Sequence, residues 1–243
     1  MLDFEFYNPT QIVFGKGRIA DLPKLIPADA RVLVLYGGGS IKSNGVLDEV
    51  RAALSGYTVQ EFAGIEPNPS YETLMQAVEL VRKEKLDFLL AVGGGSVIDG
   101  TKFVAAAVGF EGDPWQILKK RGTNITHALP FGSILTLPAT GSEMNNGSVV
   151  TRKSLKAKVP FSSRHVFPKF SILDPAKTFS LPVRQIGNGV VDAFAHVMEQ
   201  YMTYPVNAPV QDRFAEGILL TLIEEGPKAL ANPDDYDVRA NVM

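Results

Sequence analysis

The chain contains no cysteine among its 243 residues. It therefore has no disulfide, no thiolate metal site and no cysteine nucleophile, and cysteine usage leaves the redox compartment undetermined. Lysine and arginine number 24 against 26 aspartate and glutamate, so no excess of positive charge favours nucleic acid as a partner. The longest apolar runs, FVAAAVGF and ILLTLI, are too short to span a bilayer. These deficits predict a globular protein that binds neither nucleic acid nor a membrane.

The amino-terminal segment MLDFEFYNPT carries acidic residues where a signal peptide carries basic ones. We therefore expect a cytoplasmic protein. Hydrophobic residues make up 45% of the chain, which is enough to build the core of one large domain or two smaller ones.

From residue 31 to residue 99 the sequence alternates between strand-like and helix-like segments: RVLVLY, VLDEVRAAL, YTVQEF, YETLMQAVELVRKEK and DFLLAV. This alternation predicts a Rossmann-like α/β fold, with a parallel sheet covered by helices on both faces. A short strand at 11–14 precedes it, and the strand-like segments GSILTLPAT, SVVTRK and FSILDP follow. We expect residues 1–181 to form a dinucleotide-binding domain.

The composition becomes helical after Leu181, where Pro182 suits a first helical turn. We expect residues 182–243 to begin an all-helical, metal-binding domain. The last segment, DVRANVM, is helix-like and carries no stop signal, so this domain is expected to be incomplete here.

Two glycine runs follow the first and third long strands of the predicted sheet. The first comprises Gly37, Gly38, Gly39 and Ser40, and the second comprises Gly93, Gly94, Gly95 and Ser96. Glycines at a strand-to-helix turn let backbone N–H groups approach a phosphate, and the helix N-terminus adds partial positive charge. Two such loops at neighbouring strand ends favour a dinucleotide, although each alone could be a tight turn.

Neither loop fits the G-x-G-x-x-G fingerprint, because Lys42 and Ile98 occupy the last glycine position. A ribose-binding acid about 20 residues beyond the first loop would be Glu61, which would favour NAD. The segment TLPATGSE adds Thr136, Thr140, Ser142 and Glu143 near a strand end, where hydroxyls suit phosphate or ribose but also an ordinary polar turn. Lys158 could donate to a cofactor, although most such lysines are solvated.

A carboxylate and an imidazole, Asp192 and His196, stand four residues apart in the helical pattern GVVDAFAHVMEQ. The spacing puts both side chains on one face of a helix, which its apolar neighbours predict to be buried. Both groups bind divalent cations, which need at least three or four ligands. The other histidines, His127 and His165, stand in loop-like segments. On these residues alone, a carboxylate–imidazole pair in a helical core is an equal alternative.

The segments GGGS, EPNP, GGGSVIDGTK, PATGSE and GVVDAFAH occur in this order. Over its whole length the chain resembles the iron-containing (group III) alcohol dehydrogenase family, most closely its NADPH-dependent aldehyde reductase and butanol dehydrogenase branch. The resemblance implies a cleft between two domains that holds nicotinamide and metal, and hydride transfer with a small aldehyde or primary alcohol. The residues that it implies for the cofactor are Asn68, Gly94, Gly95, Ser96, Asp99, Thr136, Thr140, Ser142 and Lys158.

By the same resemblance, Asp192 and His196 are metal ligands that would hold Fe²⁺ or Zn²⁺ for catalysis. Members of the family continue through further helices with two more metal-binding histidines, so we expect the remaining ligands beyond Met243. Many NAD-preferring relatives carry an aspartate in the first glycine loop, where this chain has GGGS. With Ser40 as a hydroxyl donor and Lys42 as a nearby cation, we predict a preference for NADP(H), with NAD also admissible.

Two other functions stay open at this stage. The chain as it stands could be a nucleotide-binding module without catalysis, and glycerol dehydrogenases and dehydroquinate synthases share the same architecture. The family resemblance also implies a homodimer.

The helical segment FAEGILLTLIEEG has an apolar face, which we expect partner helices to cover. This face is formed by Phe214, Ile218, Leu219, Leu222 and Ile223.

Overall fold

A computed structural model describes residues 3–243. The chain divides into two compact units. The first, called the sheet unit below, comprises residues 8–136 and 141–174. The second, called the helical unit, comprises residues 3–7, 137–140 and 175–243.

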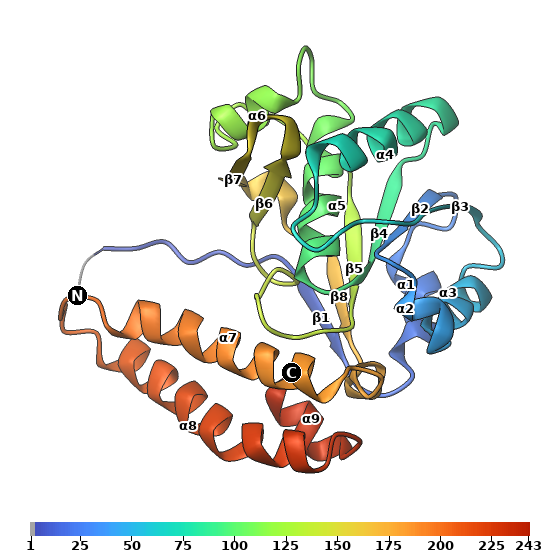
Figure 1. Cartoon of the computed structure of the whole chain (residues 1–243). Helices are drawn as coiled ribbons and strands as arrows, with labels where there is room; N and C mark the ends of the chain where they lie inside the picture. The colour runs from blue at the N-terminus through green and yellow to red at the C-terminus, as the bar shows by residue number, and fades with distance from the viewer. Residues whose placement is uncertain (1–2) are drawn as a thin grey trace. The chain divides into compact units, whose positions relative to one another are not determined.

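The sheet unit is built on six parallel strands in the order β1-β8-β5-β4-β2-β3 (Figure 1). These strands are β1 (Gln11–Phe14), β2 (Arg31–Tyr36), β3 (Thr58–Phe62), β4 (Phe88–Gly93), β5 (Phe131–Leu135) and β8 (Phe170–Leu173). Every residue of β4, β5 and β8 is buried, whereas the edge strand β1 is largely exposed and the edge strand β3 is exposed or half-buried. The predicted parallel sheet is confirmed, and its continuous apolar runs are the inner strands.

Helices cover both faces of this sheet. They are η1 (Arg18–Asp21), α1 (Leu22–Leu25), α2 (Ser40–Ser43), α3 (Val46–Ala53), α4 (Tyr71–Glu84), α5 (Gly95–Ala107) and α6 (Trp115–Lys119). Val32 and Val34 of β2 share a core cluster with Leu47 and Val50 of α3. Because side chains alternate along a strand, Leu33 and the alternate residues of β2 face the opposite side of the sheet. On that side α5 packs on β4.

A hairpin of two antiparallel strands, β6 (Gly147–Arg152) and β7 (Ala157–Ser162), completes the sheet unit together with the short helices η2 (Lys153–Leu155) and η3 (Arg164–Val166). Strand β6 contacts both α4 and α5. The hairpin therefore lies beside the two helices that follow β3 and β4.

The order of strands reverses between β2 and β4. After β2 the chain runs to β3 on one side, and after β4 it runs to β5 on the other side. Ligands of open parallel sheets bind in the crevice outside the carboxyl ends of the strands at such a point. Both glycine loops leave the sheet here, since Gly37 follows β2 and Gly94 follows β4.

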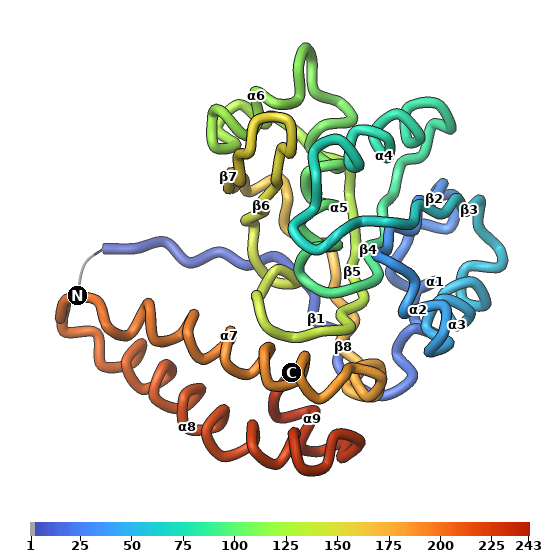
Figure 2. Tube along the Cα trace, in the orientation of Figure 1, coloured from blue at the N-terminus to red at the C-terminus, as the bar shows by residue number. Residues whose placement is uncertain are grey.

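The helical unit contains η4 (Pro175–Thr178), α7 (Val183–Tyr201), α8 (Pro209–Ala231) and α9 (Tyr236–Val242). Helices α7 and α8 lie side by side (Figure 2). A Cβ at Gly226 of α8 would lie 2.8 Å from Cγ1 of Val190, so the missing side chain lets the two helices approach. Helix α9 is anchored by the buried Arg239, whose guanidinium donates to Oγ1 and the carbonyl oxygen of Thr178, both at 2.9 Å.

The apolar face predicted for α8 is only partly buried. Leu219 and Leu222 are buried, whereas Phe214, Ile218 and Ile223 are exposed. Within residues 3–243, none of the helices combines the length and the hydrophobicity that crossing a bilayer requires.

Candidate active site

The first glycine loop turns the chain sharply at the end of β2. Gly39 has a φ of 115°, in the left-handed region that glycine tolerates best, and α2 begins at the next residue. A Cβ at Gly37 would lie 3.2 Å from the carbonyl oxygen of Ile65, whereas a Cβ at Gly38 would meet nothing within 4 Å. The loop thus leaves open space above its backbone at Gly38, where a ligand can approach. Close beside it, the ammonium of Lys42 lies 5.4 Å from the ring centroid of Tyr36.

The second glycine loop joins β4 to α5, and its Gly94 caps the helix without any side-chain hydrogen bond. A Cβ at Gly93 would lie only 2.6 Å from Cγ2 of Val97, so this position requires glycine. The amides of the first turn of an α-helix have no partner within the helix, and they attract anions. A pyrophosphate fits this arrangement of bare backbone at a helix N-terminus.

Gly100 has a packing role, although it stands outside the G-x-G-x-x-G fingerprint. A Cβ there would lie 2.8 Å from Cδ2 of Leu74, so glycine lets α5 approach α4 closely. In the Rossmann fingerprint the third glycine serves close packing of its helix. Here the fingerprint position holds Ile98, and the glycine stands two residues later.

Three residues implied for the cofactor meet beside the second loop, although they come from distant parts of the sequence. Nζ of Lys158 on β7 donates to Oδ1 of Asn68 at 2.7 Å. The backbone N–H of Asn68 in turn donates to Oγ of Ser96 at 3.3 Å. Asn68 has a φ of 58°. Its side-chain oxygen contacts the hairpin and its backbone N–H contacts the N-terminus of α5, so it links the two. Lys158, which sequence patterns alone left as a solvated lysine, therefore lies next to the second glycine loop.

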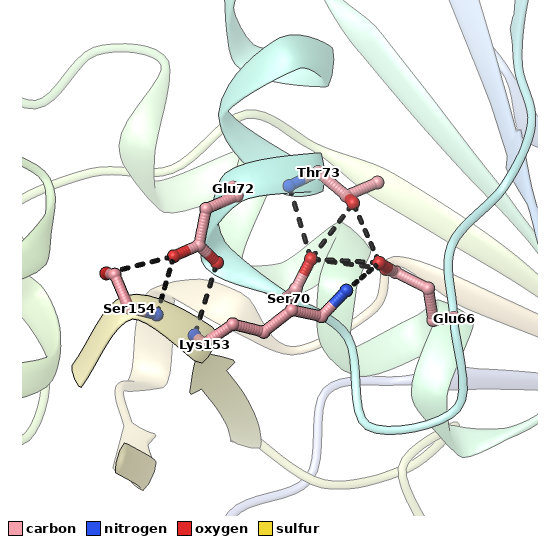
Figure 3. Close-up of polar contacts among 6 residues, drawn as sticks. All are labelled: Glu66, Ser70, Glu72, Thr73, Lys153 and Ser154. Carbon is pink, nitrogen blue, oxygen red and sulfur yellow. Dashed lines mark hydrogen bonds and ion pairs between the residues drawn. The ribbon is translucent and has the colours of Figure 1, made fainter. Parts of the chain in front are cut away.

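A network of charged and polar groups holds this part of the chain in place (Figure 3). The carboxylate of Glu66 accepts hydrogen bonds from Nζ of Lys153 at 2.8 Å, Oγ1 of Thr73 at 3.0 Å and Oγ of Ser70 at 3.0 Å. Partial burial raises the pKa of Glu66, but the hydrogen bond from Lys153 and its neighbours outweigh it and lower the pKa to about 2. Glu66 stands two residues before Asn68. This network therefore ties the segment before α4 to the hairpin.

Asp99 and Ser142 form a second group, one turn into α5. Oγ of Ser142 donates to Oδ1 of Asp99 at 2.5 Å, and the N–H of Val149 donates to Oδ2 at 2.9 Å. Burial raises the pKa of Asp99, opposed by the charge of Lys102. Two of the residues implied for the cofactor are thus held together by side chains from separate segments.

The remaining candidate residues, Thr136, Thr140 and Glu61, lie in different surroundings. Thr136 directly follows β5, and its N–H donates to the carbonyl oxygen of Gly93 at 3.1 Å, beside the second loop. Thr140 belongs to the helical unit. Glu61, the alternative ribose acid, is occupied within the protein: Arg51 donates to its carboxylate at 2.7 Å and Tyr36 at 3.1 Å.

Asp192 and His196 meet on α7, with Oδ2 and Nε2 3.6 Å apart. Two donor atoms at about 2.1 Å from a tetrahedral ion stand about 3.4 Å apart, so the pair matches the spacing of two metal ligands. The prediction of a buried face is wrong, since the side chains are 47% and 50% exposed. Val190 marks the face of α7 that packs on α8. At 100° per residue, Asp192 and His196 point to the opposite side.

Within residues 3–243 there is no group of three or more histidine, cysteine, aspartate or glutamate side chains that could hold a metal ion. The chemistry of Asp192 and His196 fits Fe²⁺ or Zn²⁺ as two of its ligands, and an ion needs more than two. His127 lies between α6 and β5, and His165 lies in η3. Both positions agree with their loop-like sequence surroundings.

Two family models together match most of the chain. Residues 9–175 match the model described as iron-containing alcohol dehydrogenase, and residues 187–243 match the C-terminal model of the Fe-containing alcohol dehydrogenase family. The chain belongs to the iron-containing alcohol dehydrogenase family.

Individual members of this family are similar over the full chain. It is 62% identical over 245 residues to the NADPH-dependent aldehyde reductase YqhD of Escherichia coli, covering 100% of this chain and 63% of that protein. It is 47% identical over 246 residues to a probable NADH-dependent butanol dehydrogenase of Bacillus subtilis, with the same coverage. The chain thus spans about 63% of the length of these curated relatives.

Solved structures of the family have the same fold. The crystal structure of Escherichia coli YqhD superposes with a TM-score of 0.98 at 62% identity, over 99% of this chain and 62% of that one. The NADH-dependent butanol dehydrogenase A of Thermotoga maritima superposes with a TM-score of 0.94 at 42% identity, over 99% and 61%. The family fold expected from the sequence motifs is therefore confirmed.

Sequence reasoning missed one charged residue of this family fold. Lys102 was not among the candidates, yet it lies completely buried beside Ser142. The available signal was a lysine three residues after Asp99, in a helix whose remaining sequence, FVAAA, is wholly apolar. A charge in such a position needs partners, because burying an unpaired charge is very costly.

Proposed function

We propose that this chain is the nucleotide-binding part and the start of the metal-binding part of an oxidoreductase that transfers hydride between NADP(H) and a small aldehyde or primary alcohol. One observation carries the proposal: two bare glycine loops at the carboxyl ends of the neighbouring strands β2 and β4, where the strand order reverses. The similarity to an NADPH-dependent aldehyde reductase supports the reaction type.

In this proposal the sheet edge binds and orients the cofactor. The backbone of Gly94, Gly95 and Ser96 at the start of α5 would bind the pyrophosphate. Asn68 and Lys158 would add an amide and a positive charge beside it, while Asp99 and Ser142 would contact the cofactor one turn further along α5. Thr136 and Thr140 complete the proposed set. Fixing the cofactor in this way brings hydride donor and acceptor into reactive geometry.

The loop of Gly37, Gly38, Gly39 and Ser40 would hold the adenosine end, where Ser40 and Lys42 would favour a 2′-phosphate and hence NADP(H). The relatives use both cofactors, since the Escherichia coli protein is named NADPH-dependent and the Bacillus subtilis protein NADH-dependent. The occupied carboxylate of Glu61 supports the choice, because it already accepts from Arg51 and Tyr36.

We place the domain boundary near residue 181, with residues 1–181 as the cofactor domain and 182–243 as the start of the all-helical domain. Family-model matches that end at residue 175 and begin at residue 187 support this division.

Asp192 and His196 would hold Fe²⁺ or Zn²⁺ together with further ligands. When bound, such an ion supplies Lewis acidity that polarises the aldehyde oxygen. The two side chains serve this role by standing one helical turn apart with converging donor atoms, 3.6 Å from each other. His196 would bind the ion as a neutral imidazole and Asp192 as a carboxylate.

Titration of the chain with NADPH, followed by the fluorescence of the reduced nicotinamide, tests the cofactor site. We expect saturable binding, tighter for NADPH than for NADH. Absence of binding to either cofactor contradicts the proposal, and tighter binding of NADH contradicts the predicted preference. Binding without aldehyde-dependent oxidation, even with added Zn²⁺ or Fe²⁺, indicates a nucleotide-binding module, whereas turnover of glycerol in place of simple alcohols indicates a glycerol-dehydrogenase-like enzyme.

Competition for Zn²⁺ with a chromophoric chelator tests the metal ligands. In a protein that supplies the further ligands, we expect His196→Ala to weaken zinc binding at least about ten-fold. Glu199→Gln is the matched control, because Oε2 of Glu199 lies 3.9 Å from Nδ1 of His196 and its side chain is 79% exposed. Equal zinc affinity of wild type and His196→Ala rules out this ligand.

We further propose that the protein is a homodimer and that it is cytoplasmic. Light scattering coupled to size exclusion tests the first, and cell fractionation tests the second.

A further inference from the structure

Lys102 is a charged residue in the interior of the sheet unit. It lies three residues after Asp99 on α5, and its exposed fraction is 0%. Desolvation of the ammonium lowers the pKa of Lys102 to about 8, although the charges of Asp99 and Glu143 oppose this shift. Burial of this charge is unfavourable unless its hydrogen bonds are satisfied.

The ammonium of Lys102 has three donors, and the structure supplies three acceptors. They are Oγ of Ser142 at 3.0 Å, Oδ1 of Asn145 at 2.8 Å and the carbonyl oxygen of Gly147 at 2.8 Å. All three lie in the segment 141–147, which connects the end of the sheet region to β6 and begins at Gly141 with a φ of 67°. The segment 141–147 thus folds around the ammonium of Lys102. Each of the three N–H donors of this group has an acceptor in the segment.

Ser142 links this lysine to Asp99. The hydroxyl oxygen of Ser142 accepts from Lys102, and the hydroxyl donates to Oδ1 of Asp99 at 2.5 Å. The hydroxyl proton therefore points towards Asp99. The second carboxylate oxygen of Asp99 accepts the N–H of Val149 on β6 at 2.9 Å. The ammonium joins this contact between Ser142 and Asp99 to Asn145 and Gly147, so it links α5 to both ends of the segment 141–147.

We propose that Lys102 is a positioning residue of the nucleotide site, which holds Ser142 and Asp99 in the orientation that binds the cofactor. The inference rests on the proposed function, since that function places Ser142 and Asp99 against NADP(H). Lys102 itself touches no cofactor in this proposal, because it acts through the segment 141–147.

Lys102→Met tests the proposal, because methionine nearly preserves the length of the side chain and removes its charge. We expect the dissociation constant for NADPH to rise about ten-fold or more. Hydrogen exchange of the amides of 141–149 should accelerate in the free protein, while exchange in α3, which packs on the other face of the sheet, stays unchanged. Asn145→Ala removes only one of the three acceptors and should weaken NADPH binding about three-fold.

The pH dependence separates positioning from a general loss of stability. A neutral amine has two donors and a lone pair facing three acceptors, so NADPH affinity of the wild type should fall between pH 7 and pH 9. Lys102→Met should lack this decline. The other ionisable groups facing Lys102 are Asp99 on α5 and Glu143 in the segment 141–147, and Lys158 on β7 acts on Asp99. Burial raises the pKa of both acids, and the charge of Lys102 opposes this shift in each.

The outcomes are distinct. A wild-type chain that binds no NADPH contradicts the proposed function itself. A wild type that binds NADPH, with Lys102→Met and Asn145→Ala binding equally well and with the same pH profile, overturns the role of Lys102. If Lys102→Met does not fold, Asn145→Ala decides: unchanged affinity and unchanged exchange of 141–149 overturn the proposal.

Discussion

The Glu66 network allows a quantitative prediction for the substitution Glu66→Gln. The carboxylate accepts three hydrogen bonds from side chains, one of them from the ammonium of Lys153 at 2.8 Å. Its pKa falls from the ordinary 4.5 to about 2, and each pKa unit corresponds to about 1.4 kcal/mol, so the upper limit is about 3.4 kcal/mol. The side chain is 32% exposed, and screening by water reduces the expected loss to about 1–2 kcal/mol.

The same pKa fixes the sign of the pH dependence. Because the folded-state pKa of Glu66 lies below the unfolded value, its contribution is complete above about pH 4.5 and disappears as the pH falls towards 2. The difference in free energy of unfolding between wild type and Glu66→Gln should therefore be constant from pH 7 to about pH 5.5. At about pH 3 it should be roughly half as large.

Urea unfolding followed by tryptophan fluorescence measures this difference in the sheet unit, because Trp115 on α6 is the only tryptophan of the chain. Glu72→Gln is the matched control in the same network. Glu72 is exposed and accepts longer hydrogen bonds, of 3.2–3.4 Å, so we expect a loss below about 0.5 kcal/mol. Equal losses for the two variants, or a loss for Glu66→Gln that stays constant down to pH 3, would refute the reasoning.

Three further predictions concern the glycine loops and the hairpin. Lys42→Ala should reduce the preference for NADPH over NADH about five-fold in binding titrations, as expected for roughly 1 kcal/mol from an exposed charge, and an unchanged ratio argues against contact with the 2′-phosphate. Gly93→Ala places a Cβ 2.6 Å from Cγ2 of Val97, so thermal unfolding should show a loss of about 1–3 kcal/mol in the free energy of unfolding. The additional substitution Val97→Ala should partly restore this stability. An unchanged stability of Gly93→Ala would mean that the turn relaxes freely. Arg152→Met removes a guanidinium 5.0 Å from the ring of Trp115, which should alter its emission and cost about 0.5–2 kcal/mol, and an unaltered spectrum contradicts the contact.

Local patterns in the sequence determined the elements of this protein. The apolar runs of 31–36 and 87–92 became β2 and β4, and a periodic helical segment became α7. Such patterns suffice because backbone hydrogen bonding and side-chain periodicity are properties of neighbouring residues. The family motifs added the expected cofactor and metal residues, including the spacing of Asp192 and His196 on one helical face.

Other features were decided only by the tertiary structure. Strand order placed β2 beside β4, and long-range packing brought Lys158 to Asn68, 90 positions away in the sequence. It also buried Lys102 and left Asp192 and His196 half-exposed, opposite to what their neighbours in sequence indicated. The physical reason is that burial depends on which distant segment covers a face, and periodicity along one helix carries no information about that partner.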